Sequence, residues 1–161
     1  MGDLCFENVD PQSESALNSM RSYFGELDQR FSHGFDPGDT LNADADHFRE
    51  PQGRFIVATA NGVTTGCGGV QLLSPNIAEI KRMWIAAEQR GRGFGGQLLG
   101  HLEVVAGELG ATTVRLDTNS VLDEAIAMYT GRGYVDIAPY NDNPYAHCWF
   151  EKSLKQGGHP D

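Results

Sequence analysis

The chain has 161 residues and a formal net charge of −10 at pH 7, and 40% of its residues are hydrophobic. This length and balance are typical of a single globular domain, residues 1–161, with a substantial core, and they argue against an intrinsically disordered chain. The acidic charge disfavours nucleic acid as a partner, because most of such a surface repels phosphate.

Membrane, metal and disulfide signals are weak. No apolar run approaches the roughly 20 residues that a membrane span needs, so no membrane partner is expected. Cys5, Cys67 and Cys148 are widely spaced and form neither a disulfide framework nor a metal-ligand spacing, so no metal site is predicted. The first residues lack the basic and apolar regions of a secretory signal. These observations predict a cytoplasmic protein.

The first half of the sequence predicts a strand, a helix and a three-stranded meander. A strand is expected at residues 4–9, and Asp10-Pro11 then predicts an N-cap followed by proline at the first helical position. Apolar residues at three- and four-residue steps continue that helix to about Arg30. A long Gly-, Pro- and Asp-rich loop follows, with a helical turn near residues 43–48. The meander has a hairpin turn at Asn61-Gly62 and strands at residues 54–59, 63–73 and 77–85.

The second half alternates helices and strands. A glycine-rich loop leads into a helix whose apolar stripe spans residues 98–109 and which Gly110 closes. Ser120-x-x-Asp123 resembles a capping box at the start of another helix. The order β-α-(α)-β-β-β-α-β-α-β-β predicts a mixed α/β (α+β) domain with a sheet of about six to seven strands. The remaining strands are expected at residues 112–118, 134–137 and 147–153, and residues 154–161 are expected to fray.

The stretch "EQRGRGFGGQLL", residues 88–99, allows two interpretations. Gly91-x-Gly93-x-x-Gly96 matches the dinucleotide-binding fingerprint and Asp117 follows at a suitable distance, so a nucleotide-dependent oxidoreductase is one alternative. The context disagrees, because several residues separate the strand from the first glycine and the strand belongs to an antiparallel meander. Backbone N–H groups that open onto a helix N-terminus, beside Arg90 and Arg92, favour instead the pyrophosphate of coenzyme A.

"EIKRMWIAAEQRGRGFGGQLL" together with "LDEAIAMYTGRGY" resembles the GNAT superfamily of acyl-CoA-dependent N-acetyltransferases. Arg90-x-x-Gly93-x-Gly95 matches the pyrophosphate motif of that family. Ala125-x-x-x-Tyr129 followed by Gly133-Tyr134 matches its second signature, a helix tyrosine before a Gly-aromatic step into the next strand. The similarity covers most of the chain. It implies a GNAT-like mixed sheet, an acyltransferase enzyme, acetyl-CoA as cosubstrate and a homodimer.

The resemblance also implies where the cofactor lies. In this family the strand before the glycine loop splays from the next, parallel strand, and the pantetheine arm lies in the gap. The backbone near Met83, Trp84 and Ile85 is then expected to pair with the arm and to polarise the acetyl carbonyl, as an oxyanion hole does. Asn119 is expected near the cofactor arm. The loop residues expected to bind the pyrophosphate are Arg90, Gly91, Arg92, Gly93, Phe94, Gly95 and Gly96.

Acetyl transfer to an amine needs a base for the amine and an acid for the leaving thiolate. Tyr129 is the expected acid, although its position also fits the apolar stripe of its helix. Glu79 lies where some family members place the base. A glutamate between apolar residues is costly to bury, so it needs either this role or an ion pair with Lys81 or Arg82. An ordered water is the alternative base.

The acceptor pocket is expected to form from the loop after the first helix and the loop between the last strands. Aromatic walls with carboxylates suit a cationic amine. The prediction is therefore direct acetyl transfer, within a ternary complex, to the primary amine of a small cationic substrate; a non-catalytic acyl-CoA sensor is the alternative. The residues expected to bind the substrate are Phe35, Asp36, Tyr140, Asn141 and Tyr145.

Overall fold

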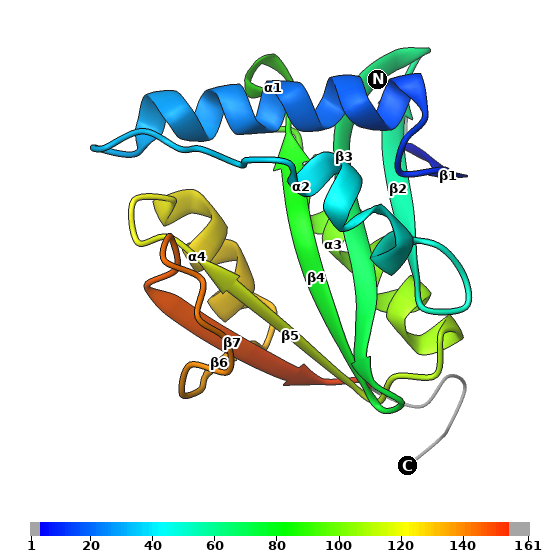
Figure 1. The fold of residues 1–161 in the computed structure, drawn as a ribbon, viewed down its shortest axis with the longest axis vertical. Coiled ribbons are helices and arrows are strands. Elements are labelled where there is room, and N and C mark those ends of the chain that lie inside the picture. The colour runs from blue at the N-terminus through cyan, green and yellow to red at the C-terminus, as the bar shows by residue number, and fades with distance from the viewer. Residues whose placement is uncertain (1–3, 155–161) are drawn as a thin grey trace.

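A computed structural model describes residues 4–154, which form a twisted sheet with helices on both faces (Figure 1). Apart from Leu154, the tail predicted at residues 154–161 lies outside the described residues. None of the helices in the described part is long and apolar enough to cross a membrane. The elements are β1 (Cys5–Val9), α1 (Glu14–Arg30), α2 (Thr40–Ala43), η1 (Ala45–Phe48), β2 (Gly53–Ala60), β3 (Val63–Ser74), β4 (Ile77–Ile85), η2 (Ala87–Gln89), α3 (Phe94–Glu108), β5 (Thr113–Thr118), α4 (Asp123–Gly131), β6 (Val135–Asp136) and β7 (Cys148–Ser153).

The seven strands lie in the order β1-β2-β3-β4-β5-β7-β6. Neighbouring strands are antiparallel except for β4 and β5, which are parallel. The prediction of a mixed sheet with six to seven strands is confirmed. This order excludes the doubly wound parallel sheet on which the dinucleotide interpretation depends, because the strand before the glycine loop follows an antiparallel meander.

The two faces of the sheet pack against different helices. Phe55 and Val57 of β2 lie in a buried cluster with Met20 and Phe24 of α1, whereas Ile56 belongs to the cluster on the other face, which contains the buried leucines of α3. This alternation follows from the period of two in a strand. Fully burying each such side chain contributes about 1.5–3 kcal/mol, so the two layers hold the meander, and with it β4, in place.

The parallel pair β4–β5 is short. Its register joins Ile77 to Thr113, Ala78 to Val114 and Glu79 to Arg115. Figure 1 shows β4 and β5 close together at one end and diverging toward the other, with α1 crossing over the wide end. The sheet is therefore open between the carboxyl halves of β4 and β5, as the family resemblance implies.

The start of α1 differs from the prediction. Ser13 is the N-cap, and its hydroxyl accepts a hydrogen bond from the Ala16 N–H at 3.3 Å. Asp10 lies too early for this role, and its carboxylate instead accepts the Gln12 N–H (3.0 Å) and pairs with Arg49 (2.7 Å). The prediction failed because the long-range pairing with Arg49 occupies the Asp10 carboxylate, whereas Ser13, three residues later, is placed to cap the helix.

The predicted capping box at residues 120–123 is also wrong. Helix α4 begins at Asp123, its N-cap residue is Leu122, and no side chain caps it. The Ser120 hydroxyl lies 2.8 Å from Nδ1 of His147, a partner on the neighbouring loop that local sequence does not indicate.

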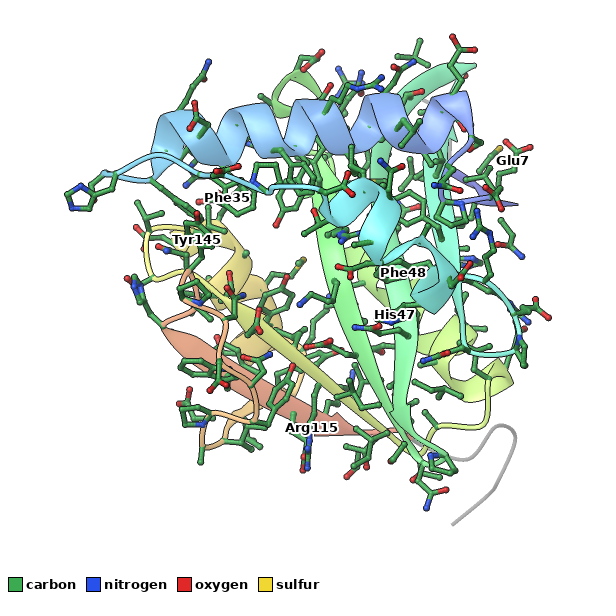
Figure 2. All side chains as sticks on the ribbon, viewed as in Figure 1. Glu7, Phe35, His47, Phe48, Arg115 and Tyr145 are labelled. Carbon is green, nitrogen blue, oxygen red and sulfur yellow. The ribbon has the colours of Figure 1, made fainter. Side chains whose placement is uncertain are left out.

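Other predicted boundaries agree with the structure or change slightly. The hairpin at Asn61-Gly62 is confirmed, with φ values of 53° and 79°. Strand β4 spans the predicted residues 77–85, whereas the strand predicted at 134–137 shortens to Val135–Asp136. The helical turn predicted near residues 43–48 is realised as α2 and η1. Figure 2 shows Phe48 of η1 over the sheet beside His47, and Phe48 is buried there.

Candidate active site

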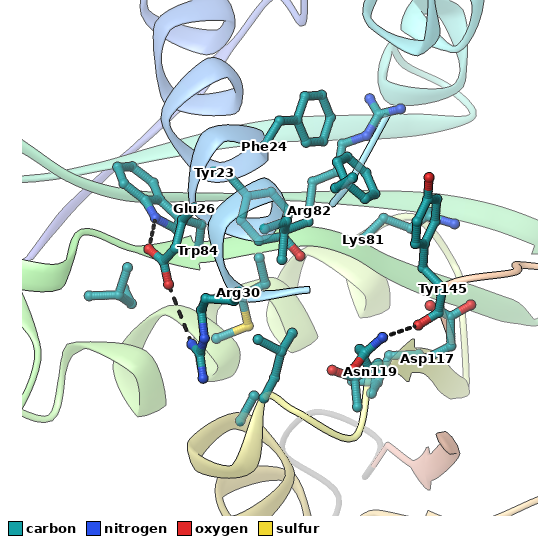
Figure 3. A pocket seen from close by; sticks show the side chains of 18 of the residues that line it. Tyr23, Phe24, Glu26, Arg30, Lys81, Arg82, Trp84, Asp117, Asn119 and Tyr145 are labelled. Carbon is teal, nitrogen blue, oxygen red and sulfur yellow. Dashed lines mark hydrogen bonds and ion pairs between the residues drawn. The ribbon is translucent and has the colours of Figure 1, made fainter. Parts of the chain in front are cut away.

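A cavity of about 510 Å³ lies where β4 and β5 separate (Figure 3). Parts of α1, β4, the glycine loop, β5, α4 and the loop between β6 and β7 line it. Its walls include Phe24 from the cluster under α1 and Leu116 from the cluster under α3. The cavity therefore runs through the gap in the sheet and is open to groups from both faces.

A break in the β3–β4 ladder shapes one wall of the cavity. Cys67 pairs with Trp84 and Gly69 with Lys81, so two residues of β4 stand opposite one residue of β3. Within this bulge Arg82 adopts φ 60°, a left-handed conformation that is uncommon for a residue with a side chain. The bulge turns the backbone of Met83 away from regular pairing. Met83, Trp84 and Ile85, the residues expected to meet the cofactor arm, all line the cavity.

The glycine loop ends the cavity at the N-terminus of α3. Gly91 (φ 82°) and Gly93 (φ 79°) are left-handed, and Gly93 is the N-cap, so no side chain caps the helix. The first intrahelical bond joins the Gln97 N–H to the Gly93 carbonyl at 3.2 Å. The three N–H groups before Gln97 therefore remain available to an anion, and the helix dipole favours negative charge at this point.

The residues of this loop do not all face the cavity. Gly91, Gly93 and two further loop residues, Phe94 and Gly95, line it together with Arg90. Arg92 is exposed and, like Gly96, is not part of the lining.

Arg132 lies beside the loop and was not expected there. A Cβ at Gly96 would overlap the Arg132 guanidinium, so the guanidinium lies directly over that glycine. The position of Arg132, three residues after the signature Tyr129, was the only sequence signal for it.

Arg90 forms an ion pair with Glu26 of α1. Its Nη2 lies 2.6 Å from both carboxylate oxygens of Glu26 in α1, and its Nε donates to the Ile85 carbonyl at 3.0 Å. The Trp84 indole N–H also donates to Glu26, at 3.2 Å, as Figure 3 shows. Glu26 thus connects α1 to the end of β4 and to the glycine loop, a connection that spans 64 residues of sequence and that local patterns do not reveal.

A second arginine joins α1 to α4 at the edge of the cavity. Arg30 Nη1 lies 2.5 Å from Glu124, and its Nη2 donates to the Val121 carbonyl at 3.1 Å. The hydrogen bond from Arg30 lowers the pKa of the Glu124 carboxyl. The two helices therefore meet across the gap through an ion pair.

Tyr129 projects from α4 into the cavity. It is 7% exposed, and its hydroxyl makes no hydrogen bond to another residue among 4–154. Burial, with a smaller contribution from the Asp117 charge, raises the pKa of Tyr129 above its usual value of 10.0. The phenol therefore stays protonated at neutral pH, the state that a general acid needs.

Tyr23 of α1 is a second tyrosine in the cavity, and the sequence analysis did not select it. Burial raises its pKa, and the neighbouring Tyr129 contributes to the rise. In the sequence, Tyr23 fits the ordinary amphipathic pattern of its helix. Its place in the cavity follows only from where α1 crosses the sheet.

Glu79 is buried (3% exposed) and does not line the cavity. Its carboxylate accepts hydrogen bonds from Gln71 Nε2 (2.8 Å) and from the Tyr140 hydroxyl (2.7 Å). Lys81 Nζ stands 4.0 Å away, and Arg82 pairs instead with Asp44 at 3.0 Å. The two hydrogen bonds use much of the hydrogen-bonding capacity of the carboxylate, and the second places the Tyr140 ring beside it.

Asp117 faces the cavity from β5. Its carboxylate accepts Asn141 Nδ2 at 2.7 Å and Asn143 Nδ2 at 3.2 Å. Asn141 and Tyr140 themselves do not line the cavity, although both were expected to bind substrate. The structure places them behind it, where they hold Asp117 and Glu79.

Aromatic rings gather where the loop after α1 meets the loop before β7. The Phe35 and Tyr145 ring centroids are 4.6 Å apart, and Phe31 lies 5.7 Å from Tyr145. Figure 2 shows Phe35 and Tyr145 approaching one another from the two loops. The Tyr145 hydroxyl accepts the Asp36 N–H at 3.1 Å, which fixes one loop against the other. The predicted residues Phe35, Asp36 and Tyr145 all line the cavity.

Asn119 lines the cavity with both ends of its amide occupied. Its Nδ2 donates to the Tyr145 carbonyl at 2.7 Å, the contact drawn in Figure 3, and its Oδ1 accepts the Val121 N–H at 2.9 Å. In this arrangement Asn119 holds the aromatic loop to the end of β5.

Comparison with known proteins agrees with this geometry. An IAA acetyltransferase of Azospirillum brasilense is 30% identical over 127 residues, which cover 73% of this chain and 82% of that protein. An uncharacterized N-acetyltransferase of Schizosaccharomyces pombe is 28% identical, with 88% of this chain and 71% of that protein covered.

Solved structures share the fold. A GNAT-family acetyltransferase from Staphylococcus aureus superposes with a TM-score of 0.82 at 18% identity, covering 95% of this chain and all (100%) of that one. A GNAT-family acetyltransferase from Elizabethkingia anophelis with acetyl-CoA bound has a TM-score of 0.66 at 16% identity, covering 94% of this chain and 98% of that one.

The sequence itself matches the profile of the acetyltransferase (GNAT) family over residues 18–134, a span that runs from α1 through the glycine loop to Tyr134. This match agrees with the open β4–β5 seam and the uncapped α3 N-terminus already described: the chain belongs to the GNAT family of acetyltransferases.

Proposed function

We propose that this protein transfers the acetyl group of acetyl-CoA directly to the primary amine of a small molecule. One observation carries the proposal: a single cavity joins the uncapped glycine loop to a carboxylate and an aromatic cluster across the gap between β4 and β5. The pyrophosphate fits the loop, the pantetheine arm fits the gap, and the amine approaches from the side of Asp117 and Tyr145. The acceptor amine is cationic before it reacts, which suits these groups.

In the proposed reaction the amine nitrogen attacks the thioester carbonyl carbon, and the C–S bond then breaks. Tyr129 gives its phenolic proton to the departing thiolate, and the backbone in the Met83 bulge stabilises the oxyanion. The amine loses its proton to Glu79 or to water. Water is favoured because the Glu79 carboxylate is buried under Tyr140 and does not line the cavity.

Direct transfer is favoured over a covalent acyl-enzyme. No cysteine lines the cavity within the described chain, and burial raises the pKa of the Cys67 thiol to about 12. Such a thiol carries almost no thiolate at neutral pH and is a poor nucleophile. Alignment of amine and thioester in a ternary complex is then the main source of rate.

Two measurements test the proposal. At about 100 times its dissociation constant, acetyl-CoA should stabilise the folded protein by roughly 2.7 kcal/mol, whereas NADH should not. Initial velocities with acetyl-CoA and an amine should give intersecting double-reciprocal lines, as a ternary complex requires. Stabilisation by acetyl-CoA without acetylation of any amine would contradict the enzyme assignment and favour an acyl-CoA sensor.

A further inference from the structure

The charged side chains around the cavity are mostly paired with one another. Three carboxylates of the lining each have an arginine partner, and a fourth, Asp36, is exposed and accepts the Gly38 N–H at 2.9 Å. Besides Asp36, the charged lining residues outside these arginine pairs, within the described chain, are Lys81 and Asp117. The pairs are Glu26–Arg90 at 2.6 Å, Glu124–Arg30 at 2.5 Å and Asp44–Arg82 at 3.0 Å.

Strand register places Lys81 and Asp117 opposite each other. The last paired residues of the parallel seam are Glu79 and Arg115. Two residues further along each strand come Lys81 and Asp117, which the period of two puts on the same face of the sheet. The strands have separated at this point, so Lys81 and Asp117 line the cavity from its two sides, and the ion pair recorded for Lys81 is with Glu79. Figure 3 draws both among the side chains that line the pocket.

The groups around Asp117 leave its carboxylate able to bind a cationic group. The two groups that hold it are neutral amides, those of Asn141 and Asn143. Its charge contributes to the raised pKa values of Tyr23 and Tyr129, so it lies close to the group proposed as the acid. An ammonium group beside this carboxylate gains a charge-assisted hydrogen bond and stands near the thioester site.

The groups around Lys81 leave its ammonium able to bind a further anionic group. Its nearest carboxylate is Glu79, at the limiting distance of 4.0 Å, and that carboxylate already accepts bonds from Gln71 and Tyr140. The Lys81 side chain is 31% exposed and lines the cavity. It can therefore donate to an acidic group that enters the gap.

We propose that the acceptor is a small zwitterion, an α-amino acid with an apolar side chain: Asp117 binds its ammonium group and Lys81 its carboxylate. A simple amine between the two would be attracted by one residue and repelled by the other, whereas a zwitterion satisfies both. The rings of Phe31, Phe35 and Tyr145 then cover the apolar side chain. The proposal rests on the proposed function and narrows its acceptor.

The first experiment compares acceptors that differ in one carboxylate, using release of CoA as the readout. Phenylalanine is measured against phenethylamine, and methionine against 3-(methylthio)propylamine. The wild-type protein should show kcat/KM at least ten-fold higher for the amino acid of each pair. Equal or better use of the decarboxylated amines would overturn the proposal and leave the acetyltransferase assignment intact.

Variants of Lys81 sharpen the same comparison. Lys81→Met should lower kcat/KM for phenylalanine at least ten-fold and leave that for phenethylamine unchanged or higher, because the repulsion of the simple amine is lost, while Lys81→Arg should restore most of the activity with phenylalanine. An equal loss for both acceptors would mean that Lys81 has only a structural role, and the proposal would fail.

A binding experiment separates the site from the reaction. Phenylalanine and phenethylamine are titrated into the protein saturated with CoA, a complex that cannot turn over. Binding of phenylalanine alone, lost in Asp117→Asn and kept in the neighbouring surface control Asp142→Asn, would support the zwitterion site even if no amine were acetylated, in which case the proposed function alone would fail. Absence of both binding and turnover with the amino acids would overturn the zwitterion site, and absence of turnover with the simple amines as well would count against the proposed function.

Discussion

The two sides of the cavity are built in different ways. On the proposed cofactor side, formed by the β4 bulge and the loop of residues 90–96, the groups facing the cavity are largely backbone groups fixed by strand and helix geometry. On the acceptor side, formed by residues 31–37 and 140–147, they are side chains on two loops that hold each other through Tyr145 and the asparagines. A fold can keep the first arrangement while the second changes, which is how one scaffold serves many acceptors.

The largest expected effect comes from Tyr129→Phe. Loss of the acid should lower kcat by about 100-fold or more without weakening acetyl-CoA binding. Because burial raises the pKa of Tyr129 above 10.0, the wild-type kcat should not fall as pH rises from 8 to about 10. Stopped-flow rates and calorimetric binding test both points. A variant that turns over at the wild-type rate would remove Tyr129 from the mechanism.

Gly93→Val should damage the cofactor side alone. A β-branched residue at φ 79° costs about 1–2 kcal/mol in a left-handed conformation, so the loop should shift and the Kd for acetyl-CoA should rise about ten-fold. Gly100→Ala is the matched control, because a Cβ there meets nothing within 4 Å. If both variants bind acetyl-CoA normally, the glycine loop is not the pyrophosphate site.

Asn143→Ala should damage the acceptor side alone. It removes one hydrogen bond to Asp117 and one to the Tyr145 N–H, so the acceptor KM should rise about five- to ten-fold while the Kd for acetyl-CoA stays constant. Asp142→Asn, in the same loop, is the control. A change in acetyl-CoA affinity instead would mean that the two sides are not separable.

The Glu79→Gln variant tests whether Glu79 is the general base or a buried residue with a structural role. The Gln amide keeps one acceptor oxygen but replaces the other by an NH2 donor, so it would face one of its two present donors, Gln71 or Tyr140, with a donor of its own, and the protein should lose about 1–3 kcal/mol of stability in urea titrations. Its kcat should fall less than five-fold if water is the base. A fall of 100-fold together with a changed acid limb of the pH profile would make Glu79 the base.

The smallest effect is expected for Glu124→Gln, which cuts the ion pair between α1 and α4. Arg30 lowers the folded-state pKa of Glu124 below its usual 4.5, so the pair stabilises the fold above that pH and the contribution disappears as pH falls through the folded pKa. The carboxylate is 57% exposed, which limits the effect at pH 7 to less than about 1 kcal/mol. Urea midpoints at pH 7.5 should differ slightly between variant and wild type, and the difference should shrink as the pH is lowered below 4.5.

The sequence predicted the cofactor side better than the acceptor side, for a physical reason. The extent of β4, the glycine loop and the position of Tyr129 depend on local patterns: strand alternation, left-handed glycines and helix periodicity. The left-handed conformation of Arg82 could not be predicted, because nothing in its neighbours requires it and arginine rarely adopts it.

The acceptor side depends on contacts between distant residues. Tyr140 and Asn141 look like pocket residues in sequence, but the β5–β7 register places them behind Asp117. Glu26 gave no signal as the partner of Arg90, since the two meet only where α1 crosses the end of β4. In the Asn141-x-Asn143 spacing, each side-chain amide oxygen accepts the backbone N–H two residues later. This turn pattern is the one local feature of the sequence that indicates the shape of the loop.

The short seam between β4 and β5 has a consequence for the stability of the sheet. Three register pairs join β5 to β4, so the unpaired edges of the two strands beyond them resemble the two neighbours of a missing strand. An extended ligand arm in that gap would complete the sheet as an added strand does. Amide hydrogens along the inner edges of β4 and β5 should then exchange with solvent more slowly in the acetyl-CoA complex, and the two halves of the protein should unfold more cooperatively.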